Sequence, residues 1–156
     1  MKQILFVCLG NICRSPAGEG ILKKILSDRG VANNFFVDSA GIGDWHVGDL
    51  PDIRMRRHGS MHGYFFDSRA RQFVIQDFDK FDYIFVMDDA NYKALKSKSR
   101  TSSDMEKVYM TGSFLRKHPG HTYVPDPYYG DDEDFELAIS LLEDACESIA
   151  DKITSF

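Results

Sequence analysis

The stretch VCLGNICRSP at residues 7–16 constrains this chain more than any other feature. It follows an apolar run at residues 4–7, typical of a buried strand, and precedes an amphipathic run at residues 16–28, typical of a helix. The stretch is therefore predicted to be a strand-to-helix turn. Because such a turn directs backbone N–H groups and the positive end of a helix dipole at one point, it is suited to binding an anion.

Two side chains of this turn add chemistry to the anion site. Cys8 lies at its mouth, and Arg14 supplies planar donors that match two oxygens of a phosphate. A cysteine at a helix N-terminus beside an arginine is expected to be a thiolate at neutral pH, and Ser15 is placed to donate its hydroxyl to the sulfur. A thiolate facing a phosphoryl group predicts attack on phosphorus and a phosphocysteine intermediate. The predicted phosphate-binding residues are Leu9, Gly10, Asn11, Ile12, Cys13, Arg14 and Ser15.

Length and composition narrow the protein class. A chain of 156 residues, 43% hydrophobic and 28% charged, is typical of one water-soluble domain, so we expect a single domain over residues 1–156. The first apolar run is too short for a signal peptide or a membrane span, so a cytoplasmic protein without membrane insertion is expected. The cysteine spacing indicates neither disulfides nor zinc, which fits a reducing compartment. A net charge of −5 argues against nucleic-acid partners.

Strand and helix signals alternate along the rest of the chain. Strands are predicted at residues 35–37, 83–86 and 107–110, and helices at 52–58, at 88–98 with Asp88 as cap, and from 135 onward with Cys146 on its apolar stripe. The helix at 52–58 is expected to stop at Gly59, and residues 63–79 are expected to be irregular with a turn or two of helix. This order predicts an α/β doubly wound, flavodoxin-like parallel sheet of about four strands with helices on both faces.

The motifs in their order resemble a known family. Cys-x5-Arg-Ser in this context resembles the loop of cysteine-dependent phosphatases, and VCLGNICRSP together with DPYYG at 126–130 resembles the low-molecular-weight protein tyrosine phosphatases. The resemblance extends over essentially the whole chain, through DSAG at 38–41, DW at 44–45, ARQ at 70–72, FDYI at 81–84 and MD at 87–88. It implies hydrolysis of phosphotyrosine in protein substrates without a metal or cofactor, and inhibition by phosphate or similar oxyanions.

Asp126 is the predicted general acid. A phenolate leaves readily only when it is protonated, so the acid must lie on a loop that reaches over the anion site. Pro125 and Pro127 flank Asp126 and hold its backbone extended. The less favoured candidates for this role are Asp44, Asp88 and Asp131.

Aromatic residues near these motifs are predicted to bind the substrate. Trp45, Tyr128 and Tyr129 are expected to form walls around a flat ring. Packing in the core is an equally open interpretation for Tyr128 and Tyr129. His46, beside Trp45, is predicted to lie at the rim.

Cys13 has two open interpretations. It is close enough in sequence to trap an oxidised Cys8 as a disulfide, and it is also suited to packing at the helix start. Cys146 is predicted to lie in the core.

Two rival functions are open to such a chain. Arsenate reduction is disfavoured because Cys146 is badly placed to relay a disulfide. Phosphopeptide binding without turnover is disfavoured because Cys8, Arg14 and Asp126 are present together.

One position departs from the family pattern. Family members often carry a histidine two positions before the ARQ motif, where it braces the loop asparagine, and here that position is Ser68. His58, His62 or a water-mediated contact of Ser68 are the candidates to brace Asn11 instead.

Several other charged residues are expected at the surface. Arg54, Arg56 and Arg57 are expected to form a solvated face, and His118 and His121 a solvated loop rather than a metal site.

Overall fold

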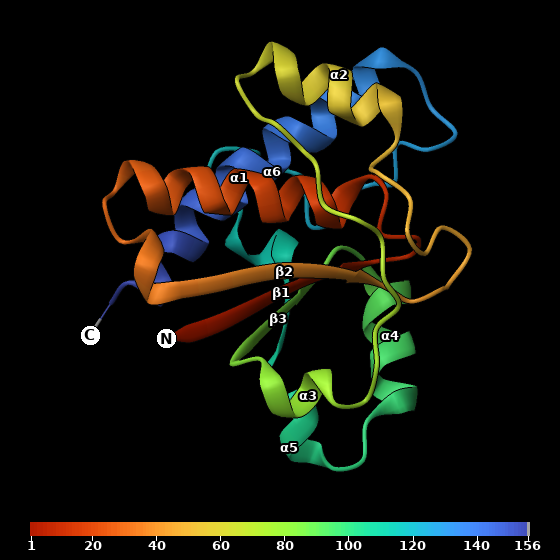
Figure 1. Ribbon diagram of the computed structural model, residues 1–156, viewed down its shortest axis with the longest axis vertical. Helices are drawn as coiled ribbons and strands as arrows, with labels where there is room; N and C mark the ends of the chain where they lie inside the picture. The colour runs from red at the N-terminus through yellow and green to blue at the C-terminus, as the bar shows by residue number, and fades with distance from the viewer. Residues whose placement is uncertain (156) are drawn as a thin grey trace.

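A sheet of four parallel strands lies at the centre of the structure, a computed structural model that describes residues 1–155 (Figure 1). The strands are, in spatial order, β2 (Phe35–Gly41), β1 (Lys2–Cys8), β3 (Tyr83–Val86) and β4 (Val108–Met110). This confirms the predicted α/β, flavodoxin-like sheet. Because all four strands run the same way, their carboxyl ends meet at one edge, where Cys8 pairs opposite Gly41.

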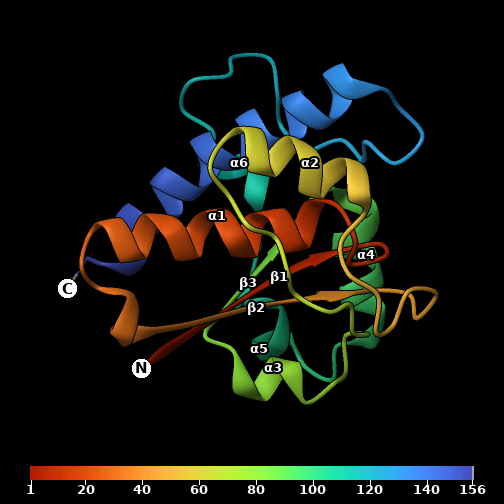
Figure 2. The same ribbon diagram turned by 45° about the horizontal axis from the view of Figure 1, so that its top comes forward.

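Helices cover both faces of the sheet, as predicted (Figures 1 and 2). On one face lie α1 (Arg14–Asp28) and α6 (Asp132–Ile153), with α2 (Ile53–Met61) packed on α6; on the other lie α3 (Asp77–Lys80), α4 (Asp89–Lys98) and α5 (Ser102–Met105). Short 3-10 helices, η1 (Ala32–Asn34) and η2 (Thr111–Phe114), precede β2 and follow β4. Within residues 1–155, no helix combines the length and apolar character needed to cross a membrane.

The side chains of β1 divide the apolar core into two parts. Ile4 and Phe6 pack with α1 and α6, whereas Leu5 and Val7 pack with the helices of the opposite face. All four side chains are fully buried. A strand covered on both faces is apolar at every position, which explains the continuous hydrophobic run that predicted it.

The C-terminal helix begins earlier than predicted. It starts at Asp132 rather than Phe135, because Asp131 accepts from the backbone N–H groups of Glu133 and Asp134 while the Asp134 side chain bonds back to the cap. The predicted apolar stripe is confirmed, since its members are at most 1% exposed: Ala138, Ile139, Leu142, Cys146, Ile149 and Ile153.

Two other boundaries differ from the prediction. β2 continues past residue 37 to Gly41, since residues 38–41 keep pairing with β1. α2 does not stop at Gly59 but runs on to Met61. A Cβ at Gly59 would collide with the ring of Phe66, so this glycine serves close packing rather than helix termination. The short helix α5 was not predicted.

Candidate active site

The turn between β1 and α1 forms the floor of the site. The chain passes through a left-handed conformation at Asn11, with φ 58°, and enters α1 at Arg14. Asparagine tolerates this conformation better than most residues. A Cβ on Gly41, at the end of the neighbouring strand, would lie 3.0 Å from the Gly10 backbone, so the glycine of the DSAG motif leaves room for the turn.

The amide of Asn11 holds the turn in shape. Its nitrogen donates to the hydroxyls of Ser15, at 2.7 Å, and Ser39, at 3.0 Å, and its oxygen accepts from the backbone N–H of Arg71 at 3.0 Å. Asn11 is only 2% exposed. Two serines and a backbone amide therefore brace the asparagine.

The prediction that His58 or His62 braces Asn11 is wrong. Both histidines lie on or next to α2 and bond to carboxylates of α6. Ser39, which braces Asn11, is in turn bonded to a buried acid of α1: its hydroxyl donates to Glu19 at 2.7 Å. The other carboxylate oxygen of Glu19 accepts from Lys23.

Cys8 is buried at the end of β1. Its sulfur lies 3.0 Å from the hydroxyl of Ser15 and accepts from the Ser15 backbone N–H at 3.4 Å. The contact between Ser15 and the sulfur that the motif predicted is therefore present.

Arg14 is oriented by two acceptors behind the turn. One terminal nitrogen, Nη1, donates to the carboxylate of Asp88 at 2.6 Å and to the carbonyl of Val124 at 2.9 Å. Burial by itself lowers the pKa of Arg14, but the charge of Cys8 and the bond to Asp88 outweigh it and hold this pKa above its ordinary value. Nε is buried without a partner in the described structure, and a buried donor normally has one. The guanidinium edge formed by Nε and Nη2 is thus left for an oxyanion.

A cavity of about 390 Å³ opens above the turn. It brings together residues from three segments that are distant in the sequence: Cys8, Leu9, Gly10, Ile12, Cys13, Trp45, His46, Asp126, Tyr128 and Tyr129. Every predicted substrate-binding residue is among them. The predicted residues Asn11, Arg14 and Ser15 are buried in the turn itself.

The aromatic residues occupy different positions in the cavity wall. Tyr129 is 95% exposed and Trp45 67% exposed, so neither is a core residue. Tyr128 is half-buried, meets the Tyr129 ring edge-on at 4.9 Å and lies 6.4 Å from the ring of His46. His46 is half-buried and lies close over Gly10, since a Cβ on Gly10 would be 3.3 Å from its ring.

Asp126 is the carboxylic acid that faces the cavity. Its side chain is 36% exposed and lies 3.6 Å from Nη2 of Arg14. The backbone N–H of Tyr128 donates to Asp126 at 3.1 Å and orients it. The alternative acid Asp88 already caps α4 and binds Arg14, and Asp131 caps α6.

Sequence reasoning missed several residues that support the site. Asp88 was predicted as a helix cap but not as the partner of Arg14, and Glu19 was not singled out. Arg54 was expected on a solvated face, but it bonds to Asp52 and to the carbonyl of Tyr128. Ser39 and Arg71 lie in the DSAG and ARQ motifs, but the sequence did not show that both bond to Asn11.

Cys13 lines the same cavity as Cys8 and is 3% exposed. Burial, followed by the charges of Asp52 and Cys8, raises the pKa of the Cys13 thiol well above its ordinary value. Cys13 is therefore protonated at neutral pH. It both lines the cavity and packs in the core, so its two interpretations stay open. Across residues 1–155, no three His, Cys, Asp or Glu side chains are grouped so that they can hold a metal ion.

Fold and site together define a class, the α/β phosphatases that carry a nucleophilic cysteine on a strand-to-helix turn. The family model described as low molecular weight phosphotyrosine protein phosphatase matches residues 3–155, and the chain belongs to this family. The pig protein of that name is 37% identical over 153 residues, which are 97% of this chain and 96% of the pig protein.

Solved structures agree with this assignment. A protein tyrosine phosphatase from Entamoeba histolytica superposes with a TM-score of 0.94 and 42% identity, over 98% of this chain and 97% of that chain. An arginine phosphatase from Drosophila superposes with a TM-score of 0.88 and 36% identity, over 99% of each chain. The family predicted from the motifs is confirmed.

Proposed function

We propose that this protein hydrolyses phosphotyrosine in protein substrates through a phosphocysteine intermediate. The Cys8 thiolate attacks phosphorus, forming a P–S bond as the P–O bond to the phenol breaks. Asp126 gives its proton to the departing phenolate oxygen. As a carboxylate, Asp126 then takes a proton from a water that attacks phosphorus, which breaks the P–S bond and releases phosphate.

The observation that carries this proposal is the unpartnered Nε of Arg14. A fully buried guanidinium donor next to Cys8 is costly unless a ligand satisfies it. An equatorial pair of phosphoryl oxygens matches the edge formed by Nε and Nη2. The charge on these oxygens grows in the transition state, so Arg14 stabilises it together with the N–H groups of the turn. The same donors suit free phosphate and related oxyanions, so we expect these anions to inhibit the enzyme.

The cavity wall supports an aromatic substrate. Leu9 and Ile12 beside Cys8 are apolar, and the rings of Trp45, Tyr128 and Tyr129 complete the wall. Phosphoarginine is the second candidate, because the Drosophila arginine phosphatase is 36% identical. The Asp126 carboxylate in the wall is an acceptor for the N–H donors of a guanidinium, so the wall accommodates this group as well. The preference for phosphotyrosine rests on the aromatic walls and on the family to which the chain belongs.

The other rival reactions find less support. Arsenate reduction needs additional thiols near the loop, but Cys146 is fully buried on α6 with its sulfur towards the carbonyl of Gly18. A binding module without turnover has no use for an acid such as Asp126 facing the cavity.

We further propose that residues 1–156 act as one phosphatase domain in the cytoplasm and bind no nucleic acid. All three cysteines are free thiols, which fits a reducing compartment, and the net charge of −5 disfavours nucleic-acid binding.

The test compares three substrates in the wild type and in Cys8→Ser, with and without a chelator. We expect turnover of a phosphotyrosine peptide and an aryl phosphate, little of a phosphoarginine peptide, and no effect of chelator. Cys8→Ser should lose turnover but still bind phosphate, because Arg14 and the turn amides remain. Activity of Cys8→Ser within about tenfold of wild type would remove Cys8 as nucleophile, and a preference for phosphoarginine would overturn the substrate assignment.

A further inference from the structure

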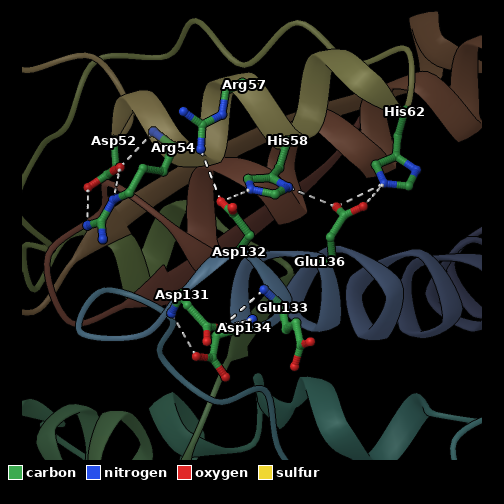
Figure 3. Close-up of polar contacts among 10 residues, drawn as sticks. All are labelled: Asp52, Arg54, Arg57, His58, His62, Asp131, Asp132, Glu133, Asp134 and Glu136. Carbon is green, nitrogen blue, oxygen red and sulfur yellow. Dashed lines mark hydrogen bonds and ion pairs between the residues drawn. The ribbon is translucent and has the colours of Figure 1, made fainter.

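A buried histidine joins α2 to the start of α6 (Figure 3). His58 is 3% exposed, and its ring stacks on Phe135 with centroids 5.8 Å apart. Its Nε2 lies 2.9 Å from the carboxylate of Asp132, and its Nδ1 lies 3.2 Å from that of Glu136. We call these three residues, His58, Asp132 and Glu136, the α2–α6 clasp.

The clasp is a charged network. A carboxylate only accepts hydrogen bonds, so His58 makes both contacts as a donor when each ring nitrogen carries a proton. The hydrogen bond from His58 lowers the pKa of Asp132. Burial raises the pKa of Glu136, but the bonds from His62 and His58 more than offset this, and the net shift is downward. Both acids are therefore ionised at neutral pH.

Two further side chains of this region face the same acids. Arg57 lies 3.1 Å from Asp132, and His62 lies 3.0 Å from Glu136. These contacts are solvent-exposed, with Arg57 60% and Asp132 74% exposed, and exposed pairs contribute little to stability. His58 differs because its own side chain is buried and stacks on Phe135 of α6.

The clasp lies directly after the loop that carries Asp126. We call residues 125–131 the acid loop. Asp132 is the first residue of α6 and follows the helix cap, Asp131. The contact between His58 and Asp132 therefore fixes the point where the acid loop ends.

Arg54, one turn earlier on α2, holds the middle of the same loop. It donates to the carbonyl of Tyr128 at 3.0 Å and lies over the rings of Tyr128, at 5.4 Å, and Phe135, at 4.7 Å. Two bonds to the Asp52 carboxylate, at 3.0 and 2.9 Å, orient the guanidinium (Figure 3). Since the Tyr128 N–H bonds to Asp126, contacts lead without a gap from α2 to the acid.

The N-terminus of α2 is also tied to the phosphate-binding turn. The backbone N–H of its cap, Asp52, donates to the carbonyl of Ile12 at 2.8 Å. α2 thus contacts the floor of the site through its cap, the acid loop through Arg54, and the start of α6 through His58. Its placement against α6 sets where Asp126 lies relative to Cys8.

We propose that His58 is a positioning residue for the general acid: by clamping α2 to α6, it lets Arg54 hold Tyr128 and Asp126 over Cys8. This inference rests on the proposed phosphatase function and extends it to a residue outside the cavity. It predicts a loss that depends on the leaving group, because protonation matters most for poor leaving groups.

The test uses His58→Leu, which keeps an apolar contact with Phe135 but cannot bond to the carboxylates. We expect kcat/KM for phenyl phosphate to fall about tenfold and that for an activated dinitrophenyl phosphate by less than about twofold. In an Asp126→Ala background, the same substitution should add no further dependence on the leaving group. The double variant Asp132→Ala/Glu136→Ala removes both acceptors and leaves His58 in place, so it should reproduce the effect and guards against misfolding of His58→Leu.

Arg29→Leu is the matched control. Arg29 also bonds to two carboxylates of α6, those of Glu147 and Asp151, but at the end remote from the acid loop. Because these pairs are also exposed, Arg29→Leu should leave both the melting temperature and the dependence on the leaving group close to wild type.

The outcomes separate this inference from the proposed function. Suppose that the wild type turns over aryl phosphates and that Asp126→Ala shows a steep leaving-group dependence. If His58→Leu and the double variant then lose equally on both substrates, the positioning role alone is overturned. A wild type without aryl phosphatase activity, or an Asp126→Ala variant with wild-type leaving-group dependence, would overturn the function and the positioning role together.

Discussion

The Ser39 hydroxyl donates to the Glu19 carboxylate at 2.7 Å, and this bond sets the direction of the hydrogen bonds that lead to Cys8. With its own proton used, the Ser39 oxygen accepts from the amide of Asn11. The same amide nitrogen also donates to Ser15, whose proton then has two acceptors within reach, the sulfur of Cys8 at 3.0 Å and the carbonyl of Ala40 at 3.4 Å. Three side chains, those of Ser39, Asn11 and Ser15, thus link Glu19 to Cys8 by hydrogen bonds.

Glu19→Gln should change the direction of the hydrogen bond between residue 19 and Ser39. The glutamine oxygen would face the ammonium of Lys23, and its NH2 group would face Ser39, whose oxygen would then accept from both amides while its own proton loses its acceptor. We expect alkylation of Cys8 by iodoacetate near neutral pH to slow by about tenfold, since a hydrogen bond to a charged group contributes ~1.5–3 kcal/mol. Lys23→Met, which keeps the carboxylate, is the control. Equal alkylation rates in Glu19→Gln and wild type would contradict this role.

Arg14→Lys should lower kcat/KM by about 10²–10³-fold. A lysine supplies a point charge and cannot bond to Asp88 and Val124 while presenting two parallel donors to phosphate. Steady-state kinetics with an aryl phosphate measure the loss, and circular dichroism checks the fold. Near-normal turnover would show that Arg14 serves only the structure.

Asp126→Ala should slow phosphorylation of Cys8 by about 10²–10⁴-fold for a leaving group such as tyrosine, whose phenol has a pKa of ~10. An activated nitrophenol should suffer less, and the basic limb of the pH profile should disappear. Because hydrolysis of phosphocysteine can limit turnover, kcat/KM or the product burst is the quantity to measure. Equal losses on both substrates would make Asp126 a positioning group instead.

Peroxide should inactivate the enzyme, and dithiothreitol should restore it. Cys13 lines the same cavity as Cys8, so Cys13→Ser should recover less fully after equal exposure. The protonated state of Cys13 predicts a slow disulfide step, because the thiolate is the attacking species. Recovery of Cys13→Ser to the wild-type level would leave packing as the sole role of Cys13.

Acid should weaken the contact between Arg100 and Asp104. The side-chain bond from Arg100 is the main cause that lowers the pKa of Asp104 from 3.8 to about 2. A carboxylate with a lowered pKa stabilises the fold above its ordinary pKa, and this stabilisation is lost as pH falls from 3.8 to about 2. Asp104→Asn should therefore melt below wild type at neutral pH and close to it near pH 2. Exposed Glu106→Gln is the control, and an unchanged difference at both pH values would contradict the assignment.

The sequence by itself determined the elements whose cause is local. The strand before Cys8, the turn and the helix after it follow from apolar periodicity and the short motif, and Asp88 was predicted as a cap because caps depend on neighbouring backbone N–H groups. The parallel sheet followed from the alternation of strand and helix signals. Local rules failed at Gly59, where a distant ring, that of Phe66, explains the glycine.

Only the tertiary structure decided which distant groups meet. Arg14 bonds to residues 74 and 110 positions away, and Asn11 accepts from a backbone amide 60 positions away. Arg54 was expected on a solvated face, yet it bonds to the carbonyl of Tyr128, 74 positions away, and His58 bonds to Asp132 across the same separation. Such pairings depend on how helices pack over a finished sheet, and no periodicity along the chain encodes that distance. The motif therefore specified the reactive groups, and packing specified what holds them in place.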